Sequence, residues 1–299
     1  MNAVDRNLYR MRERGLRAIE GQDFSHLPRR FWVARMAGQA RSRVMEGEEE
    51  LLEMLRMFGF EEVSFERLTA HEQIAIMANA EVMMSYHGAG FANMLFANSN
   101  THVLEVGTLQ TAMFRWGDFW RLANVAGCNY VSFFADFAQE DQRIKPRFSE
   151  TGIVPVALSR AGLAVVMSFL VSLLGHMPTY SRAEDVLRVA RQLHQIGASN
   201  RALELFGKHP GVEEGNAPLC LLLADCHGQR GDHRAELETL KRALIADPSG
   251  AFIVMKIVWA AHKLNDRTEV NLALNRLRQD FPEKFDSMLR DQPWLRRLV

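Results

Sequence analysis

The pattern of apolar residues changes near residue 180, and this change constrains the fold more than any other feature of the sequence. Before Pro178, short apolar runs typical of buried strands alternate with helical segments. After Pro178 the strand-like runs stop, and helical segments continue to the end of the chain. Because alternating strands and helices are typical of βαβ units, we expect an α/β domain with a parallel sheet, followed by an all-α domain.

The first region contains short apolar runs that we interpret as strands, at 31–34, 62–65, 82–85, 102–106, 130–133 and 153–157. Helices are predicted between them, at 46–58, 73–80, 91–96, 116–126 and after Ser159. The segment 46–58 has the i, i+3, i+4, i+7 spacing of an amphipathic helix. Thr69 and Glu72 form a capping sequence at the start of the next helix.

One apolar stretch, 162–175, has to be weighed as a membrane segment. It contains about 14 residues, whereas a spanning helix needs about 20. Extending it upstream brings in Arg160 and Pro155. We therefore predict a buried core helix and no integral membrane segment, with a membrane anchor as the alternative.

The helical region repeats with the period of a tetratricopeptide array. Pro248 and Pro282 each close a helical unit, and they lie 34 residues apart. Counting back from each proline starts units at Ala217 and Ala251, and a partial unit is predicted from Ala183. We expect tetratricopeptide-like helical repeats that serve a protein partner, with a generic helical bundle as the alternative.

Charge and cysteine content exclude several classes of protein. Lys and Arg number 36 and Asp and Glu number 36, so no net charge draws the chain to nucleic acid. The three cysteines, Cys128, Cys220 and Cys226, are too scattered for a disulfide framework or a zinc site. The N-terminus has no apolar core typical of a secretory signal. We therefore expect a reducing, cytoplasmic location and no nucleic-acid partner.

The densest chemical signal lies between Ser85 and Glu105. A short buried strand ends at His87, and a turn with Gly88 and Gly90 leads into a helical segment. Glycines allow close approach of a ligand to the backbone, and a helix N-terminus favours an anion such as a diphosphate. Asn93 offers a hydrogen-bonding amide, and Glu105 ends the next strand at the same sheet edge. On spacing alone, a tight turn beside a hydrogen-bonded histidine is the alternative.

The string HGAGFANMLF, followed by VLEV, resembles the hallmark of the family 61 glycosyltransferases. Other segments resemble that family in the same order, namely Val33-Ala34-Arg35, Arg41-Ser42-Arg43, the helix 72–81 and the segment 120–130. The resemblance spans roughly Arg29 to Leu174. The sequence departs from the family pattern in having Glu46-Gly47 where Asn-Glu is usual.

This resemblance implies a GT-B-type fold, an inverting mechanism and a nucleotide-sugar donor bound by a Rossmann-like half. It implies that Arg35 and Arg43 contact the diphosphate and that Glu105 binds ribose or base. The donor-holding turn that it implies comprises His87, Gly88, Ala89 and Gly90, together with Asn93. His87 is also the candidate catalytic residue. The sequence contains no Asp-x-Asp, the motif with which GT-A enzymes hold a divalent metal, so we expect no metal cofactor.

We therefore expect an N-terminal segment (1–28), a GT-B-type nucleotide-sugar-binding domain (29–178) and tetratricopeptide-like repeats (179–299). The predicted function is transfer of a sugar from a nucleotide-sugar to a glycan or polysaccharide acceptor. A complete GT-B enzyme has a second Rossmann-like domain, which we expect from another chain or from residues upstream. The alternative is a noncatalytic interaction module with a remnant donor domain. For the aromatic residues Phe114, Trp116 and Trp120, we predict packing in the core rather than stacking on a sugar or base.

Overall fold

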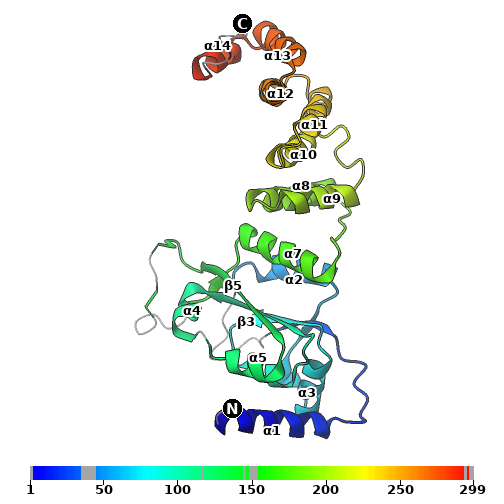
Figure 1. Ribbon diagram of the computed structural model, residues 1–299, viewed down its shortest axis with the longest axis vertical. Helices are drawn as coiled ribbons and strands as arrows, with labels where there is room; N and C mark the ends of the chain where they lie inside the picture. Colours follow the sequence, from blue (N-terminus) through cyan, green and yellow to red (C-terminus); the bar gives the residue numbers. More distant parts are fainter. Residues whose placement is uncertain are drawn as a thin grey trace. The chain divides into compact units, whose positions relative to one another are not determined.

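The computed structural model of the protein describes residues 3–34, 45–115, 117–143, 146–147, 154–292 and 295 (Figure 1). The chain divides into two compact units, Met1–Val166 and Met167–Val299. The first is an α/β unit and the second is all-α, as the change of apolar pattern predicted. The helix α7 (Arg160–Leu174) crosses the division between them.

The α/β unit is built on a six-stranded sheet with the order β2-β1-β3-β4-β5-β6. The first five of these strands in sheet order are parallel, and β6 pairs antiparallel with β5. This confirms the predicted Rossmann-like parallel sheet. The strands are β1 (Arg30–Val33), β2 (Glu61–Val63), β3 (Val82–Tyr86), β4 (His102–Thr108), β5 (Asn129–Phe137) and β6 (Val156–Ala157).

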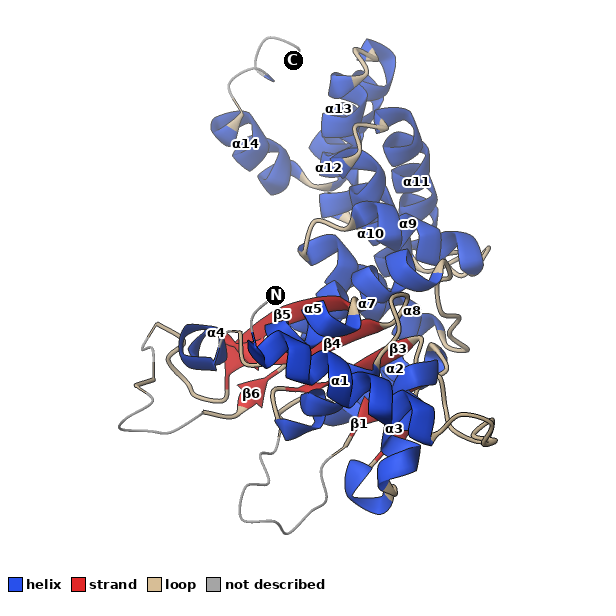
Figure 2. Cartoon of the chain, turned by 60° about the horizontal axis from the view of Figure 1, so that its bottom comes forward, coloured by secondary structure: helices blue, strands red, loops and turns tan. Residues whose placement is uncertain are grey.

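Helices cover both faces of this sheet, because the right-handed connections toward β2 and toward β5 run on opposite sides. The helix α2 (Glu48–Met57) lies on one face (Figure 1). The other face is covered by α3 (Ala70–Asn79), the 3₁₀ helix η2 (Ala89–Phe96) and α5 (Trp120–Ala126). The N-terminal helix α1 (Ala3–Ala18) packs on the outside of these three elements (Figure 2).

The strand order reverses between β1 and β3, because the chain moves from β1 out to β2 and then returns to the other side of β1. In open α/β sheets such a switch point leaves a crevice beyond the carboxyl ends of the two strands, where ligands bind. The carboxyl ends here are Val33 and Tyr86. The turn from His87 to Gly90 therefore begins at the position in the fold where a ligand is expected.

Several elements differ from the prediction in this region. The strand predicted at 62–65 ends at Val63, and Phe65–Arg67 forms a 3₁₀ turn (η1) whose buried Phe65 points into the core. The segment after His87 is a 3₁₀ helix and not an α-helix. A helix α4 (Leu109–Arg115) that was not predicted precedes α5. The capping box of Thr69 and Glu72 is confirmed at the start of α3.

After the end of α7, the described residues of the second unit form three helical hairpins and a last helix. The hairpins are α8 (Ala183–Gln195) with α9 (Ser199–Lys208), α10 (Ala217–Gln229) with α11 (His233–Ala246), and α12 (Ala251–Lys263) with α13 (Arg267–Asp280). Helix α14 (Pro282–Asp291) follows. The first helices of the hairpins begin 34 residues apart, at the predicted starts, and the unit predicted as partial from Ala183 is a full hairpin.

The turn inside each hairpin repeats with the same period. Gly197, Gly231 and Asn265 occupy equivalent positions, and all three have the left-handed backbone conformation, with φ of 77°, 76° and 58°. Such a conformation favours glycine, and asparagine is among the side chains that tolerate it best. Asp232 and Asp266 then cap the second helices of two successive hairpins through equivalent side-chain hydrogen bonds of 3.1 Å.

Two negative findings apply to the described part of the chain. Within it, no helix combines the length and the apolar composition that crossing a membrane requires. Within the same residues, no group of three or more potential metal ligands is placed to hold an ion.

Candidate active site at the carboxyl edge of the sheet

His87 occupies the first position beyond β3, and the sheet holds its backbone in place. Its peptide N–H donates to the carbonyl of Val106 on β4 at 3.1 Å, which extends the β3–β4 ladder by one bond. Two residues earlier, the hydroxyl of Ser85 donates to the carbonyl of Val33 at 2.8 Å and ties β3 to the end of β1. Hydrogen bonds of the sheet therefore fix the backbone position from which the side chain of His87 enters the site.

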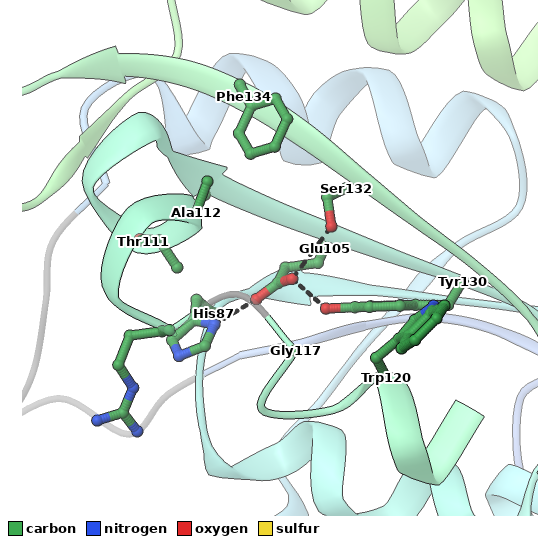
Figure 3. Close-up of a pocket in the computed structure, with 11 residues that line it drawn as sticks. His87, Glu105, Thr111, Ala112, Gly117, Trp120, Tyr130, Ser132 and Phe134 are labelled. Atoms are coloured by element: carbon green, nitrogen blue, oxygen red, sulfur yellow. Dashed lines mark hydrogen bonds and ion pairs between the residues drawn. The ribbon is translucent and has the colours of Figure 1, made fainter. Parts of the chain in front are cut away.

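Glu105 lies in the middle of β4 and is buried, yet its carboxylate is hydrogen-bonded at both oxygens. Oε1 pairs with Nδ1 of His87, and Oε2 accepts from the hydroxyl of Tyr130. The hydroxyl of Ser132 lies 3.3 Å from the same Oε2. Figure 3 shows the three side chains converging on this carboxylate from β3 and β5, the strands on either side of β4.

Strand register explains why these residues meet. Glu105 is directly opposite Ser85 on β3 and Ser132 on β5. Side chains two residues apart share a face of a strand, so His87 and Tyr130 lie on the same face as Glu105. That face is the one covered by η2 and α5. The aligned strands thus create one polar cluster, in which His87 and Glu105 are buried, Tyr130 is half-buried and Ser132 is exposed.

The hydrogen bond from Tyr130 keeps its phenol protonated. Burial raises the pKa of Tyr130 above its usual range, and the hydrogen bond to Glu105 and the negative charge of that carboxylate raise it further. The phenol is therefore a permanent donor near neutral pH. Oε2 of Glu105 therefore accepts a hydrogen bond from Tyr130, while Oε1 is the partner of His87.

His87 lines an open cleft together with the other members of the cluster, and its ring contacts the buried carboxylate directly. A carboxylate at Nδ1 favours the tautomer with the proton on Nδ1, so Nε2 carries the lone pair. Nε2 lies 3.8 Å from Oδ2 of Asp118, which is too far for a hydrogen bond. The ring also packs against Phe119, with 5.2 Å between the ring centroids. The hydrogen bond to Glu105 and the packing against Phe119 hold the imidazole in one orientation.

The cleft beside His87 has about 390 Å³ of empty space, part of it open to solvent. Its lining includes His87, Glu105, Arg115, Trp120, Tyr130 and Phe134. Two aromatic side chains flank it in an exposed state, Trp120 at 63% and Phe134 at 61% (Figure 3). Nε of Arg115 donates to Asp118 at 2.7 Å and leaves the rest of a half-exposed guanidinium beside the opening. The cleft combines a histidine, a cation and flat apolar surfaces.

The prediction that Trp120 and Phe114 pack in the core is wrong. Trp120 is at the start of α5 and Phe114 is in α4, where it is 50% exposed. Trp116 lies outside the described residues. Trp120 is instead part of the cleft wall, where an aromatic face is available to a ligand.

The remaining predicted site residues lie around the turn and not in the cleft lining. Gly90 lies against Val33 and Phe65, where an added Cβ would be 3.5 Å and 3.4 Å from the two side chains. Gly88 is half-buried and Ala89 is exposed, so the turn is at the surface. The amide of Asn93 donates to Gln73 of α3 at 3.1 Å. The structure thus brings His87 and Glu105 together and leaves Asn93 in a contact within the fold.

Arg35 and Arg43, the predicted diphosphate contacts, lie outside the described residues. The last described residue before them is Ala34, whose N–H donates to Val63 at 2.9 Å. Gly90 packs against Val33, the residue before Ala34.

Sequence reasoning missed Tyr130, Ser132, Arg115 and Asp118. Tyr130 and Ser132 could have been found by noting two polar groups at alternate positions of a predicted strand next to Glu105. Arg115 and Asp118 lie in and after a helix that was not predicted, and no local signal marks them.

Comparison with protein families supports the resemblance over part of the chain. Residues 2–104 match the model of a family described as Glycosyltransferase 61. The match starts upstream of Arg29, includes all of α1 and ends one residue before Glu105, so it includes the histidine–glycine turn. None of the curated proteins matches the chain. Over residues 2–104, about a third of its length, the chain is therefore similar to the glycosyltransferase 61 domain.

Proposed function

We propose that the α/β unit binds a nucleotide-sugar and takes part in transferring its sugar to a hydroxyl of a glycan or polysaccharide acceptor. The observation that carries this proposal is the pairing of His87 with the buried Glu105 beside an open cleft. The match of residues 2–104 to the glycosyltransferase 61 model supports it.

The pair has the chemistry that an inverting transfer requires. In such a transfer the acceptor hydroxyl attacks the anomeric carbon as the bond to the diphosphate breaks, and the diphosphate leaves with the bonding electrons. His87 accepts the hydroxyl proton at Nε2, and Glu105 stabilises the imidazolium that forms. A buried carboxylate serves this role well because a low local dielectric strengthens its attraction for the imidazolium.

Cationic side chains take the place of a metal in this proposal. The departing diphosphate gains negative charge, and guanidinium groups match its oxygens in a bidentate way. Arg35 and Arg43 remain the predicted contacts, and Arg115 at the cleft opening is a further candidate. We also propose a reducing, cytoplasmic location, which the absence of any cysteine pair among the described residues supports.

The helical unit supplies a second proposed function, the docking of a protein partner. Its three hairpins with a 34-residue period give a regular surface of the kind that helical repeats use for binding. If the donor site proves inactive, this interaction function remains for the chain.

Calorimetric titration with UDP-, GDP- and CMP-linked sugars tests the nucleotide-sugar proposal. We expect one of them to bind, and His87→Gln to lower the rate of sugar transfer about a hundredfold or more. His102→Gln is the matched control, because His102 lies at the amino end of β4, away from the cleft. If none of the donors bound, the proposal would be wrong. If the two variants lowered the rate of sugar transfer equally, His87 would have no specific role in catalysis.

A further inference from the structure

The outer surface of helix α1 carries a row of arginines that the proposed sugar transfer does not use. Arg6, Arg10 and Arg14 are spaced four residues apart, Arg17 follows three residues later, and all four are exposed. At 3.6 residues per turn these positions fall on one face of the helix and span about 16 Å along its axis. We call these four residues the arginine row.

Contacts on the opposite face fix the orientation of the helix. Nη1 of Arg12 donates to the carbonyl of Leu95 at 2.7 Å, and Asp5 pairs with Arg121 of α5 at 3.6 Å. Gly15 lies so close to Phe96 that an added Cβ would be 2.4 Å from the ring. Residues 5, 12 and 15 share the inward face, so helix geometry directs the arginine row away from the unit.

The arginine row keeps most of its charge unpaired. Among the described residues, Arg6, Arg10 and Arg14 form no ion pair, and Arg17 pairs only with Glu13 on the same helix. The chain as a whole has equal numbers of basic and acidic residues. The positive charge is therefore a local, linear feature and not a consequence of composition.

Apolar side chains flank the row. Val4 is 50% exposed and Met11 is 52% exposed, and both lie along one border of the arginine face. A helix with a cationic face and an apolar border fits a flat anionic surface, because guanidinium groups bind phosphates while the apolar chains enter the interface. A nucleic acid would satisfy the arginines but would leave Val4 and Met11 in water.

We propose that α1 docks the protein on a membrane surface rich in anionic phospholipid, through the arginine row and its apolar border. The inference rests on α1 alone and does not depend on the sugar chemistry of the cleft. It describes a reversible, peripheral contact, because a single interfacial helix with few apolar residues binds through charge more than through insertion.

Cosedimentation of the full chain with lipid vesicles tests this proposal. We expect binding to phosphatidylcholine vesicles that contain phosphatidylglycerol, little binding to phosphatidylcholine alone, and weakening by added salt. Replacing Arg6, Arg10 and Arg14 by Gln should lower the vesicle affinity about a hundredfold. Arginine and glutamine have similar helix propensities, so the helix should persist, which circular dichroism and thermal melting would check.

Two further variants make the test specific. Arg234, Arg267 and Arg278 are exposed on the helical unit, and changing these three to Gln alters the net charge by the same amount. This matched control should bind vesicles like the unchanged protein. Val4→Ser with Met11→Ser should weaken vesicle binding several-fold and leave any binding to duplex DNA unchanged.

Each outcome of these experiments either supports the membrane proposal or overturns it. Loss of vesicle binding in the arginine-row variant but not in the control supports the proposal. Failure of the unchanged protein to bind anionic vesicles, or equal losses in both charge variants, overturns it. Binding to duplex DNA that exceeds vesicle binding and ignores Val4 and Met11 overturns it in favour of a polyanion site.

Discussion

The two units of this chain obtain their structure from different kinds of information. In the helical unit, position determines role, because residues 34 apart occupy equivalent places, as Gly197, Gly231 and Asn265 do in the hairpin turns. In the α/β unit the important residues share no period. His87, Glu105 and Tyr130 meet only because strand pairing aligns three separate segments. Substitutions at equivalent positions of different repeats should therefore have similar effects. A residue of the polar cluster, in contrast, has no equivalent elsewhere in the chain, so its loss should be specific to the site.

The largest effect is expected for a substitution within the polar cluster. Glu105→Gln keeps the size of the side chain but removes the charge that, in the proposed mechanism, stabilises the imidazolium of His87. We expect the rate of sugar transfer to fall about a thousandfold, with donor affinity changed far less. Single-turnover kinetics beside calorimetric titration would separate the two effects. The control is Glu66→Gln, since Glu66 lies on the exposed η1 turn; a normal rate for Glu105→Gln would end the claim that this carboxylate assists catalysis.

A smaller effect tests whether equivalent positions in the repeats behave alike. Asp232→Ala and Asp266→Ala each remove the side-chain cap of a second hairpin helix. Each should lower the free energy of unfolding by about 1 kcal/mol, because one backbone N–H loses its acceptor. Urea unfolding followed by circular dichroism gives both values. If the two losses of unfolding free energy differed severalfold, equivalent positions in the repeats would not contribute equally to stability.

The smallest effect concerns the one repeat turn without glycine. Asn265 has a φ of 58°, a conformation that glycine adopts with less strain. Asn265→Gly should raise the free energy of unfolding by about 0.5 kcal/mol, whereas Gly231→Ala should lower it by about 1 kcal/mol. Thermal melting of the two variants side by side would measure the difference. A stabilising Gly231→Ala would contradict the assignment of these turns as equivalent.

These differences also explain which features could be predicted from sequence. The hairpin starts at Ala217 and Ala251 follow from the spacing of two prolines, because a local signal repeats at a fixed interval. The strands were located because buried parallel strands read as short apolar runs. The 3₁₀ form of η2 and the helix α4 were missed, since short helices have too few residues for a periodic signal.

The candidate site was predictable only in part. His87 and Glu105 could be named from the motif, but the role expected for Glu105, contact with ribose or base, did not anticipate its hydrogen bonds to His87, Tyr130 and Ser132. Those bonds depend on the register of β4 with β3 and with β5, which no local pattern encodes.

The shortness of the outermost strands has a consequence for self-association. β2 contributes three residues to one border of the sheet and β6 contributes two to the other. Unpaired backbone at a sheet border is the usual template for adding a foreign strand, and such short strands offer very little of it. Any assembly of this unit with a second α/β chain should therefore proceed through helices and loops, with the two sheets remaining separate.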